Sequence, residues 1–278
     1  MASRAKSSRL KVAGATLYYE VQGSGPVLIL IPGGPTDAGV FAGLAACLAD
    51  RYTVAACDPR GNSRSVLDGA REEQRLDVHG DDMARLIEAL GDEPACVFGS
   101  SGGGQIGLNL AARHPARVRV LVAHEPPCLK MLPDPSQALA GNRAVADAYR
   151  SGGVPAAMQK FAEVTGLGGG PPRADAPPPP PEIQETFARI ERNMDYFFAC
   201  GLVPLSDYEP DVAALRAGPV PVVIGVGEDS VGQTAYRTAV ALAEKLGRPP
   251  VIFPGDHGGY GPQAEAFAAT LDRVLRSA

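Results

Sequence analysis

The chain has 278 residues and a formal net charge of −5 at pH 7. This length allows one large α/β domain or two average ones, and the negative balance argues against nucleic acid or an anionic membrane surface as the main partner. Since no run of about 18 apolar residues is present, we expect no membrane-spanning helix.

Five cysteines are present, an odd number without a C-x-x-C pair, and most of them lie in apolar runs. This pattern predicts buried free thiols in a reducing compartment. The basic segment 1–11 is not followed by the apolar run of a secretory signal. We therefore expect a cytoplasmic protein.

In the first half of the chain, short apolar runs alternate with amphipathic segments. Residues 9–13 and 15–21 predict a hairpin about Gly14. The continuous apolar run 27–31 is typical of a strand that is buried on both faces of a parallel sheet. Further strands are predicted at 52–57, 96–98 and 118–123, and helices at 38–49, 77–90 and 105–113. This alternation predicts a mostly parallel sheet with helices on both faces.

The alternation stops between residues 126 and 205. Only helical patterns are found there, at 137–150, 154–164 and 182–199, and they are interrupted by the Gly/Pro-rich segment 166–181, which predicts a surface loop. Strands at 221–226 and 251–253 then alternate with helices at 208–217, 233–246 and 262–276. We therefore predict an α/β core of residues 1–125 and 206–278, split by a helical cap at 126–205.

A nucleophile elbow is predicted where the strand at 96–98 runs into Gly99-Ser-Ser-Gly-Gly103 and then into a helix. A serine in a tight turn with positive φ needs small neighbours, because strand and helix pass close together there. Gly99 and Gly103 stand two residues to either side of Ser101. The N-terminus of the following helix also favours developing negative charge. The pattern predicts Ser101 as a nucleophile.

With this elbow in place, the chain resembles the α/β-hydrolase superfamily at four places in the right order. They are Pro32-Gly33-Gly34-Pro35, the Asp58–Ser65 stretch, the elbow about Ser101, and His257. The resemblance implies an α/β-hydrolase fold: a mostly parallel, eight-stranded sheet with helices on both faces and a helical cap inserted after the sixth strand. It does not specify a substrate.

A serine nucleophile needs a base and an acid that orients the base. His257 lies in a glycine-rich loop after the last strand, where this family keeps its general base. The family usually supplies the acid in a Gly-x-x-Asp pattern after the seventh strand, but Asp229 stands one residue early here. Some members take the acid from the end of the sixth strand, which corresponds to Glu125. Asp229 and Glu125 both remain candidates, with Glu228 behind them.

The resemblance also implies two backbone donors for an oxyanion, the N–H groups of Gly102 and Gly34. The turn that contains Gly34 usually starts with histidine in this family, and Pro32 stands there instead. Because Pro32 has no imidazole ring to brace the loop, other residues must hold the loop in place.

Three further residues are predicted to line the substrate pocket. His124 ends a strand on the ligand side of the predicted sheet. Tyr196 and Phe197 belong to an aromatic cluster in the cap, for which packing of the cap on the core is an equal alternative.

The leading functional interpretation is hydrolysis of a small, fairly apolar carboxylic ester through an acyl-serine intermediate. The sequence has no zinc-spaced ligand cluster and no dinucleotide or Walker motif, so we expect no metal and no cofactor. One alternative is a proline-iminopeptidase-like peptidase, in which Glu185, Glu191 and Asp195 of the cap would be available to hold a free amine. Two others are a C–C bond hydrolase of the same fold and a non-catalytic small-molecule-binding member. The expected partner is a small-molecule substrate, with the chain as a monomer or homodimer.

Overall fold

The computed structural model describes residues 5–167 and 179–278. Its centre is a sheet with the strand order β1-β2-β4-β3-β6-β7-β8-β9, and the short β5 pairs with β2. The strands β1, β2 and β4 pair antiparallel, and every later neighbour on this path pairs parallel. The strands are β1 (Lys6–Val12), β2 (Ala15–Gly23), β3 (Val27–Ile31), β4 (Thr53–Cys57), β5 (Val66–Leu67), β6 (Ala95–Ser100), β7 (Val118–His124), β8 (Val222–Gly227) and β9 (Val251–Phe253).

The mostly parallel sheet of eight strands is thus confirmed, and the hairpin turns at Gly14, whose φ is +75°. The two residues of β5 were not predicted, because a strand of that length is too short to show a periodicity. Because β5 adds one strand to the count, the strand before the predicted cap is β7.

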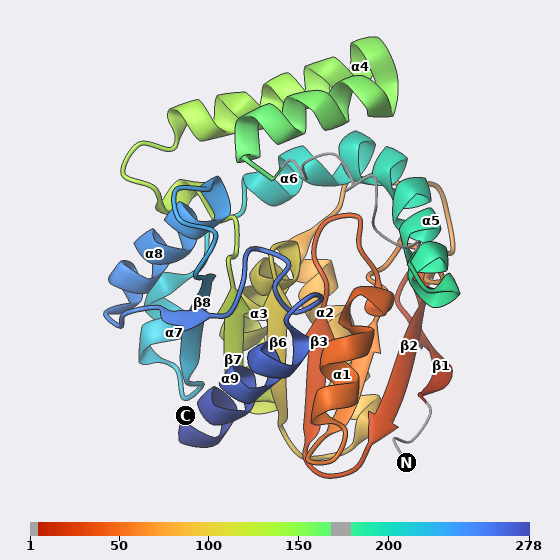
Figure 1. Cartoon of the computed structure of the whole chain (residues 1–278), viewed down its shortest axis with the longest axis vertical. Helices are drawn as coiled ribbons and strands as arrows, with labels where there is room; N and C mark the ends of the chain where they lie inside the picture. The colour runs from red at the N-terminus through yellow and green to blue at the C-terminus, as the bar shows by residue number, and fades with distance from the viewer. Residues whose placement is uncertain (1–4, 168–178) are drawn as a thin grey trace.

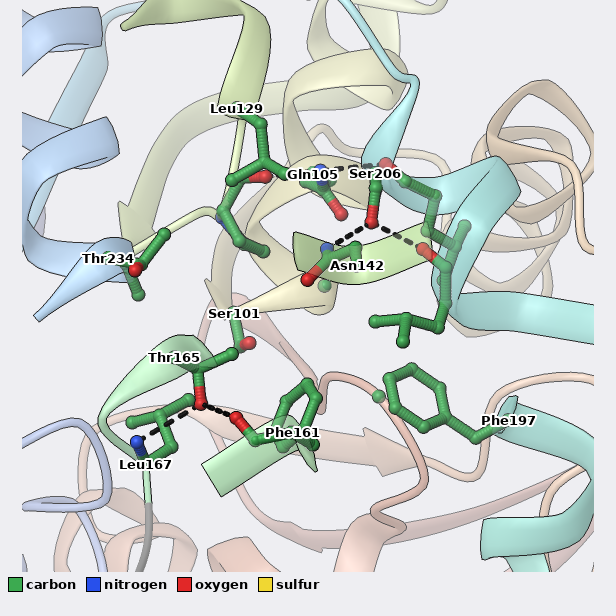
Figure 2. A pocket seen from close by; sticks show the side chains of 16 residues that line it. Ser101, Gln105, Leu129, Asn142, Phe161, Thr165, Leu167, Phe197, Ser206 and Thr234 are labelled. Atoms are coloured by element: carbon green, nitrogen blue, oxygen red, sulfur yellow. Dashed lines mark hydrogen bonds between the residues drawn. The ribbon is translucent and has the colours of Figure 1, made fainter. Parts of the chain in front are cut away.

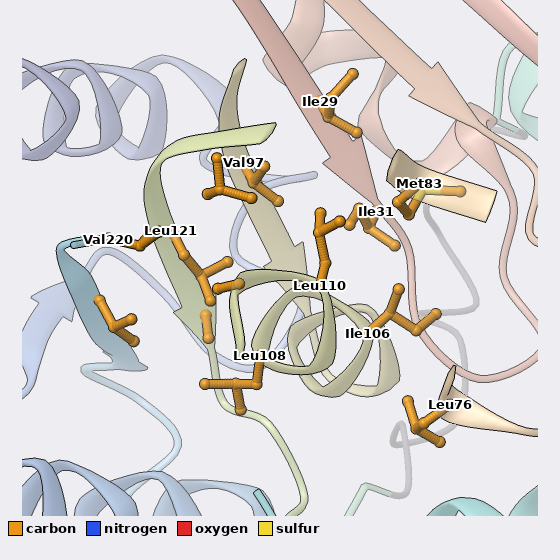
Figure 3. Packing of buried hydrophobic residues seen from close by; sticks show 14 of the residues in the cluster. Ile29, Ile31, Leu76, Met83, Val97, Ile106, Leu108, Leu110, Leu121 and Val220 are labelled. Carbon is orange, nitrogen blue, oxygen red and sulfur yellow. The ribbon is translucent and has the colours of Figure 1, made fainter. Parts of the chain in front are cut away.

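Helices cover both faces of the sheet (Figure 1). One face carries α2 (Leu76–Leu90), α3 (Gly102–Arg113), α7 (Val212–Ala217) and α8 (Thr234–Leu246), and the other carries α1 (Ala42–Leu48) and α9 (Ala264–Ser277). Figure 3 shows the first of these cores, where Ile106 and Leu110 of α3 pack toward the strands.

Strand β3 illustrates why a strand in the middle of this sheet has a continuous apolar sequence. Ile29 and Ile31 pack into the α2–α3 core, whereas Leu28 and Leu30 pack into the α1–α9 core, and all four side chains are fully buried. Successive side chains of a strand point to opposite faces, so only an apolar run satisfies both faces. Each buried aliphatic side chain contributes about 2 kcal/mol.

Residues 126–205 are called here the cap segment, and the described part of this segment lies across one end of the sheet, between β7 and α7 in the chain (Figure 1). Their helices are α4 (Ser136–Thr165), α5 (Pro181–Tyr196) and α6 (Leu202–Ser206), with a π-turn at Phe197–Gly201. Helix α4 is broken at Gly153, where φ is 66°, so it contains the two predicted helices in sequence. Residues 168–178 of the predicted loop lie outside the described residues, and the division into core and cap domains stays a prediction.

A buried ion pair fastens the cap segment to the core. The guanidinium Nε of Arg189 on α5 lies 2.6 Å from Oδ2 of Asp37, whose side chain is fully buried. Burial alone would raise the pKa of Asp37, but the hydrogen bonds from Arg189, Ser63 and Gly39 outweigh it and lower this pKa. Nearby, the Asn193 amide of α5 donates to the Pro35 carbonyl at 2.8 Å.

All five cysteines are described and all are free thiols, three of them buried. In the described ranges, no helix has both the length and the apolar character that crossing a bilayer requires.

Candidate active site

Ser101 occupies a strained turn between β6 and α3. Its φ is 56°, and α3 begins at the next residue. A Cβ on Gly99 would collide with the carbonyl of Gly103, and one on Gly103 would collide with the carbonyl of Ile31. The predicted elbow is therefore present, and its glycines are required because strand and helix approach so closely.

Backbone hydrogen bonds tie the elbow to the end of the neighbouring strand. The N–H of Ser101 donates to the carbonyl of His124 at 2.8 Å. His124 is the last residue of β7, and the next residue, Glu125, has a φ of 45°. A positive φ in a residue with a side chain is strained and occurs frequently at functional sites. Two strained residues thus lie at adjacent strand ends.

Of the two candidate acids, Glu125 is the one whose side chain contacts His257. Its Oε2 lies 2.6 Å from Nδ1 of His257, and its Oε1 accepts the backbone N–H of Gly227 at 2.8 Å. The Glu125 side chain is fully buried, while that of His257 is 17% exposed. With Nδ1 engaged, Nε2 is the ring nitrogen that remains for a reacting hydroxyl.

Burial alone would raise the pKa of Glu125. The hydrogen bond from His257, the nearby imidazoles of His124 and His257, and the N–H of Gly227 outweigh that effect and lower this pKa. The acid is therefore ionised at neutral pH, which is the form that stabilises an imidazolium.

The other candidate acid, Asp229, does not reach His257, and its prediction as the acid is corrected. Its side chain is exposed, and only its backbone N–H contacts the histidine loop, through the Gly255 carbonyl at 3.0 Å. Glu228 is also exposed, and its Oε1 accepts the N–H of Gly255 at 3.2 Å. The chain thus departs from the Gly-x-x-Asp pattern, and in this structure Glu228 and Asp229 bind the backbone of the loop that carries His257.

The two predicted oxyanion donors lie side by side. Gly34 has a φ of 55°, and a Cβ on Gly102 would lie 3.1 Å from the Gly34 nitrogen. In place of a histidine ring, Asn62 braces the loop: its Nδ2 donates to the carbonyls of Gly34 at 3.0 Å and Thr36 at 3.1 Å. Sequence reasoning missed Asn62, since a buried amide in a loop carries no periodic signal.

A narrow cavity of about 70 Å³ opens at the elbow (Figure 2). Its walls combine the elbow and oxyanion residues with side chains of α3, the cap segment and α8, and none of the lining residues is charged. The lining consists of Gly34, Ser101, Gly102, Gln105, Pro127, Leu129, Asn142, Phe161, Thr165, Leu167, Phe197, Leu202, Leu205, Ser206, Thr234 and Ala235.

Of the three predicted pocket residues, Phe197 lines this cavity, and the other two do not. His124 is fully buried among the rings of Phe98, Phe253 and Phe267, and this burial lowers its pKa to about 3. Tyr196 points away from the cavity and packs over Gly61 in the core. Neither side chain lines the cavity: His124 belongs to an aromatic cluster of the core, and Tyr196 packs between the cap segment and the core.

Sequence reasoning missed the polar side chains of the cavity. Gln105 follows the elbow in α3, a largely apolar helix that also contains Asn109 and Arg113, and Asn142 lies in α4. A buried amide inside an apolar helical stripe is the signal that could have identified Gln105.

Within residues 5–167 and 179–278, no group of three or more histidine, cysteine, aspartate or glutamate side chains is arranged to hold a metal ion. The independence from metals and cofactors stays a prediction.

Comparison with known proteins agrees with the fold described above. Residues 26–164 match the family model described as alpha/beta hydrolase fold. The uncharacterized hydrolase YraK of Bacillus subtilis is 35% identical over 272 residues, which cover 96% of this chain and 94% of YraK.

Two solved structures share the fold over nearly their whole length. A hydrolase from Pseudomonas aeruginosa PA01 is 21% identical with a TM-score of 0.76, over 99% of this chain and 100% of the other. A thermophilic esterase from Thermogutta terrifontis is 18% identical with a TM-score of 0.71, over 99% of each chain. With the match to the family model, the near-complete alignment to YraK and the strained serine elbow, the chain belongs to the α/β-hydrolase fold family and is a hydrolase of that fold.

Proposed function

We propose that this hydrolase cleaves a small, fairly apolar carboxylic ester through an acyl-serine intermediate. The observation that carries the proposal is the contact of the buried Glu125 carboxylate with His257, 2.6 Å long, at the sheet end that also bears Ser101. A paired carboxylate and imidazole next to a strained serine is the arrangement that activates a hydroxyl.

In the proposed reaction, Ser101 Oγ attacks the ester carbonyl while Nε2 of His257 takes the hydroxyl proton. The N–H groups of Gly34 and Gly102 stabilise the resulting oxyanion. The tetrahedral intermediate then collapses, and the alcohol leaves with the proton from His257. Water repeats the sequence on the acyl-serine and releases the acid. Glu125 remains ionised throughout and stabilises the imidazolium.

The shape and chemistry of the cavity support a small neutral substrate. Its volume is about 70 Å³, which is room for a handful of water molecules or a short acyl chain. Its lining is largely apolar and carries no charged side chain. The carboxylates considered for a peptidase do not line it, since Glu185, Glu191 and Asp195 are all exposed on the cap segment. A free amine would find no counter-charge there, which disfavours the peptidase alternative.

Labelling with a fluorophosphonate probe, followed by kinetics on 4-nitrophenyl butanoate, tests the proposal. We expect the wild type to be labelled and active, and Ser101→Ala to lose labelling and roughly 10⁴–10⁶-fold in kcat. Activity on proline-β-naphthylamide should stay far below the ester rate.

An unlabelled wild type with no esterase activity would overturn the proposal and favour the non-catalytic binding alternative. Preferential cleavage of the proline amide would favour a peptidase. The circular dichroism spectrum of Ser101→Ala should match that of the wild type, because its methyl group fits the space of the serine Cβ.

A further inference from the structure

Two amide side chains give one end of the apolar cavity an unusual polarity. Gln105 of α3 is 1% exposed and Asn142 of α4 is 9% exposed, and both line the cavity beside the elbow. Buried amides usually have both ends satisfied. Here the nitrogen of each amide is bonded to the protein, whereas the side-chain oxygen accepts no hydrogen bond from the part of the chain that the structure describes.

The surrounding groups fix which end of each amide faces the cavity. The Ser206 hydroxyl donates to the Leu202 carbonyl, so its single proton is used and it can only accept from Asn142. The Asn142 nitrogen therefore faces Ser206 at 2.6 Å, and its oxygen faces away. The same logic holds for Gln105, whose nitrogen donates to the carbonyls of Pro127 at 3.2 Å and Leu205 at 3.1 Å.

Figure 2 shows this arrangement directly. The Asn142 and Gln105 oxygens lie on the opposite side from their hydrogen-bonded nitrogens and face the middle of the cavity. The two residues come from α3 in the core and α4 in the cap segment, so the pair of acceptors forms only when these elements meet. Together these two oxygen atoms form a binding site that accepts hydrogen bonds and donates none.

We infer that the substrate carries a neutral hydrogen-bond donor, a hydroxyl or an amide N–H, which binds Gln105 Oε1 and Asn142 Oδ1. The inference deepens the proposed ester hydrolysis and rests on it for the reacting bond. A charged ammonium is disfavoured because no anionic side chain lines the cavity. A purely apolar substrate would leave two buried acceptors unpaired, which selects against it.

Binding measured in the Ser101→Ala background tests the inference without relying on turnover. Ethyl 3-hydroxybutanoate is compared with ethyl butanoate, and ethyl N-acetylglycinate with its N-methyl analogue, by isothermal titration calorimetry. We expect the donor-bearing member of at least one pair to bind about tenfold more tightly, the effect of one or two neutral hydrogen bonds. The pair that shows the preference identifies the donor as hydroxyl or amide.

Asn142→Leu should reduce this preference to less than threefold, since leucine has a similar size but no acceptor. Thr165→Val is the matched control in the same cavity. The Thr165 hydroxyl is already used, because it donates to the Phe161 carbonyl and accepts the N–H of Leu167, so the preference should persist. Ser206→Ala, which frees the Asn142 amide to rotate, should give an intermediate value.

Equal binding within both pairs, or a preference unchanged by Asn142→Leu, would overturn the inference. Circular dichroism of each variant ensures that a lost preference is not a lost fold. The wild-type labelling and kinetics above report separately on the ester reaction. A protein that binds the donor-bearing ester but does not hydrolyse it would contradict only the proposed function.

Discussion

The two sides of the cavity are held in place by different kinds of contact. On the sheet side, Ser101, Glu125 and Gly34 all have positive φ and lie at strand ends joined by backbone hydrogen bonds. On the cap side, the lining comes mainly from α4, α6 and the π-turn between α5 and α6. Side-chain contacts such as that of Arg189 with Asp37 help to attach the cap segment to the core. The reacting groups are therefore positioned by the backbone, and the substrate-facing groups by helix packing.

This difference has a chemical consequence. A strained backbone held by neighbouring strands keeps donors and nucleophile fixed, which an oxyanion site requires. Helices attached by side chains can shift or exchange residues without disturbing the strands. We therefore expect substitutions on the sheet side to reduce turnover, and substitutions on the cap side to change stability or preference.

The largest expected effect comes from the acid. Glu125→Gln should lower kcat about 10⁴-fold, because the amide no longer stabilises the imidazolium or selects its tautomer. Asp229→Asn is the matched control, and it should change kcat less than twofold since its side chain is exposed and does not contact His257. Steady-state kinetics on 4-nitrophenyl butanoate measure both. A loss in Asp229→Asn equal to that in Glu125→Gln would contradict the assignment of the acid.

The next effect concerns the attachment of the cap segment. Asp37→Asn leaves the Arg189 cation beside a neutral amide, which should lower the free energy of unfolding by roughly 2–4 kcal/mol at pH 7. Asp195→Asn is the control: it breaks the exposed pair with Arg71, whose side chains are 57% and 54% exposed, and should cost under about 1 kcal/mol. Urea denaturation gives both values. Similar losses in the two variants would show that burial of the pair is unimportant.

The contribution of Asp37 should also depend on pH. Because its pKa is lower in the folded than in the unfolded protein, its stabilisation is present above about pH 4 and is lost as the pH falls through the folded pKa. The difference between wild type and Asp37→Asn should therefore be constant from pH 7 to pH 5 and shrink below pH 4. A difference that grows on acidification would have the wrong sign for this ion pair.

The smallest expected effect concerns the loop that replaces the histidine brace. Asn62→Leu should lower kcat about tenfold with KM changed less than twofold, because the oxyanion donor of Gly34 loses its fixed position. This loss is smaller than the loss expected when an oxyanion donor is removed altogether. The affinity for a trifluoromethyl ketone, which mimics the tetrahedral intermediate, should fall in parallel with kcat. A rise in KM alone would indicate a role in ground-state binding instead.

Much of the core could be predicted from the chain alone. The predicted strands 27–31 and 118–123 match β3 and β7 closely, because a strand buried on both faces leaves an almost continuous apolar signal, interrupted in β7 by the exposed Arg119. The elbow could also be predicted, since Gly99 and Gly103 are dictated by local steric contact. Two predicted cap helices match the arms of α4 about Gly153, and a third matches α5 within a few residues, whereas α6 was not predicted.

The acid and the pocket lining depended on the tertiary structure. Glu125 and Asp229 both suited the order of the chain, and only the meeting of β7, β8 and the histidine loop places Glu125 Oε2 at 2.6 Å from His257. His124 ends its strand beside the elbow, yet its side chain points into the core. The direction of a side chain at the end of a strand depends on the pleat of the strand and on the packing around it.

By itself, then, the sequence determined the sheet, the strained serine turn and the histidine loop, because these depend on local sterics and on the burial period of strands. The tertiary structure decided which carboxylate orients His257, how Asn62 replaces the missing brace, and which amide oxygens face the substrate. Those features join residues far apart in the chain, and no spacing along a sequence encodes the distance between two side chains that meet only after folding.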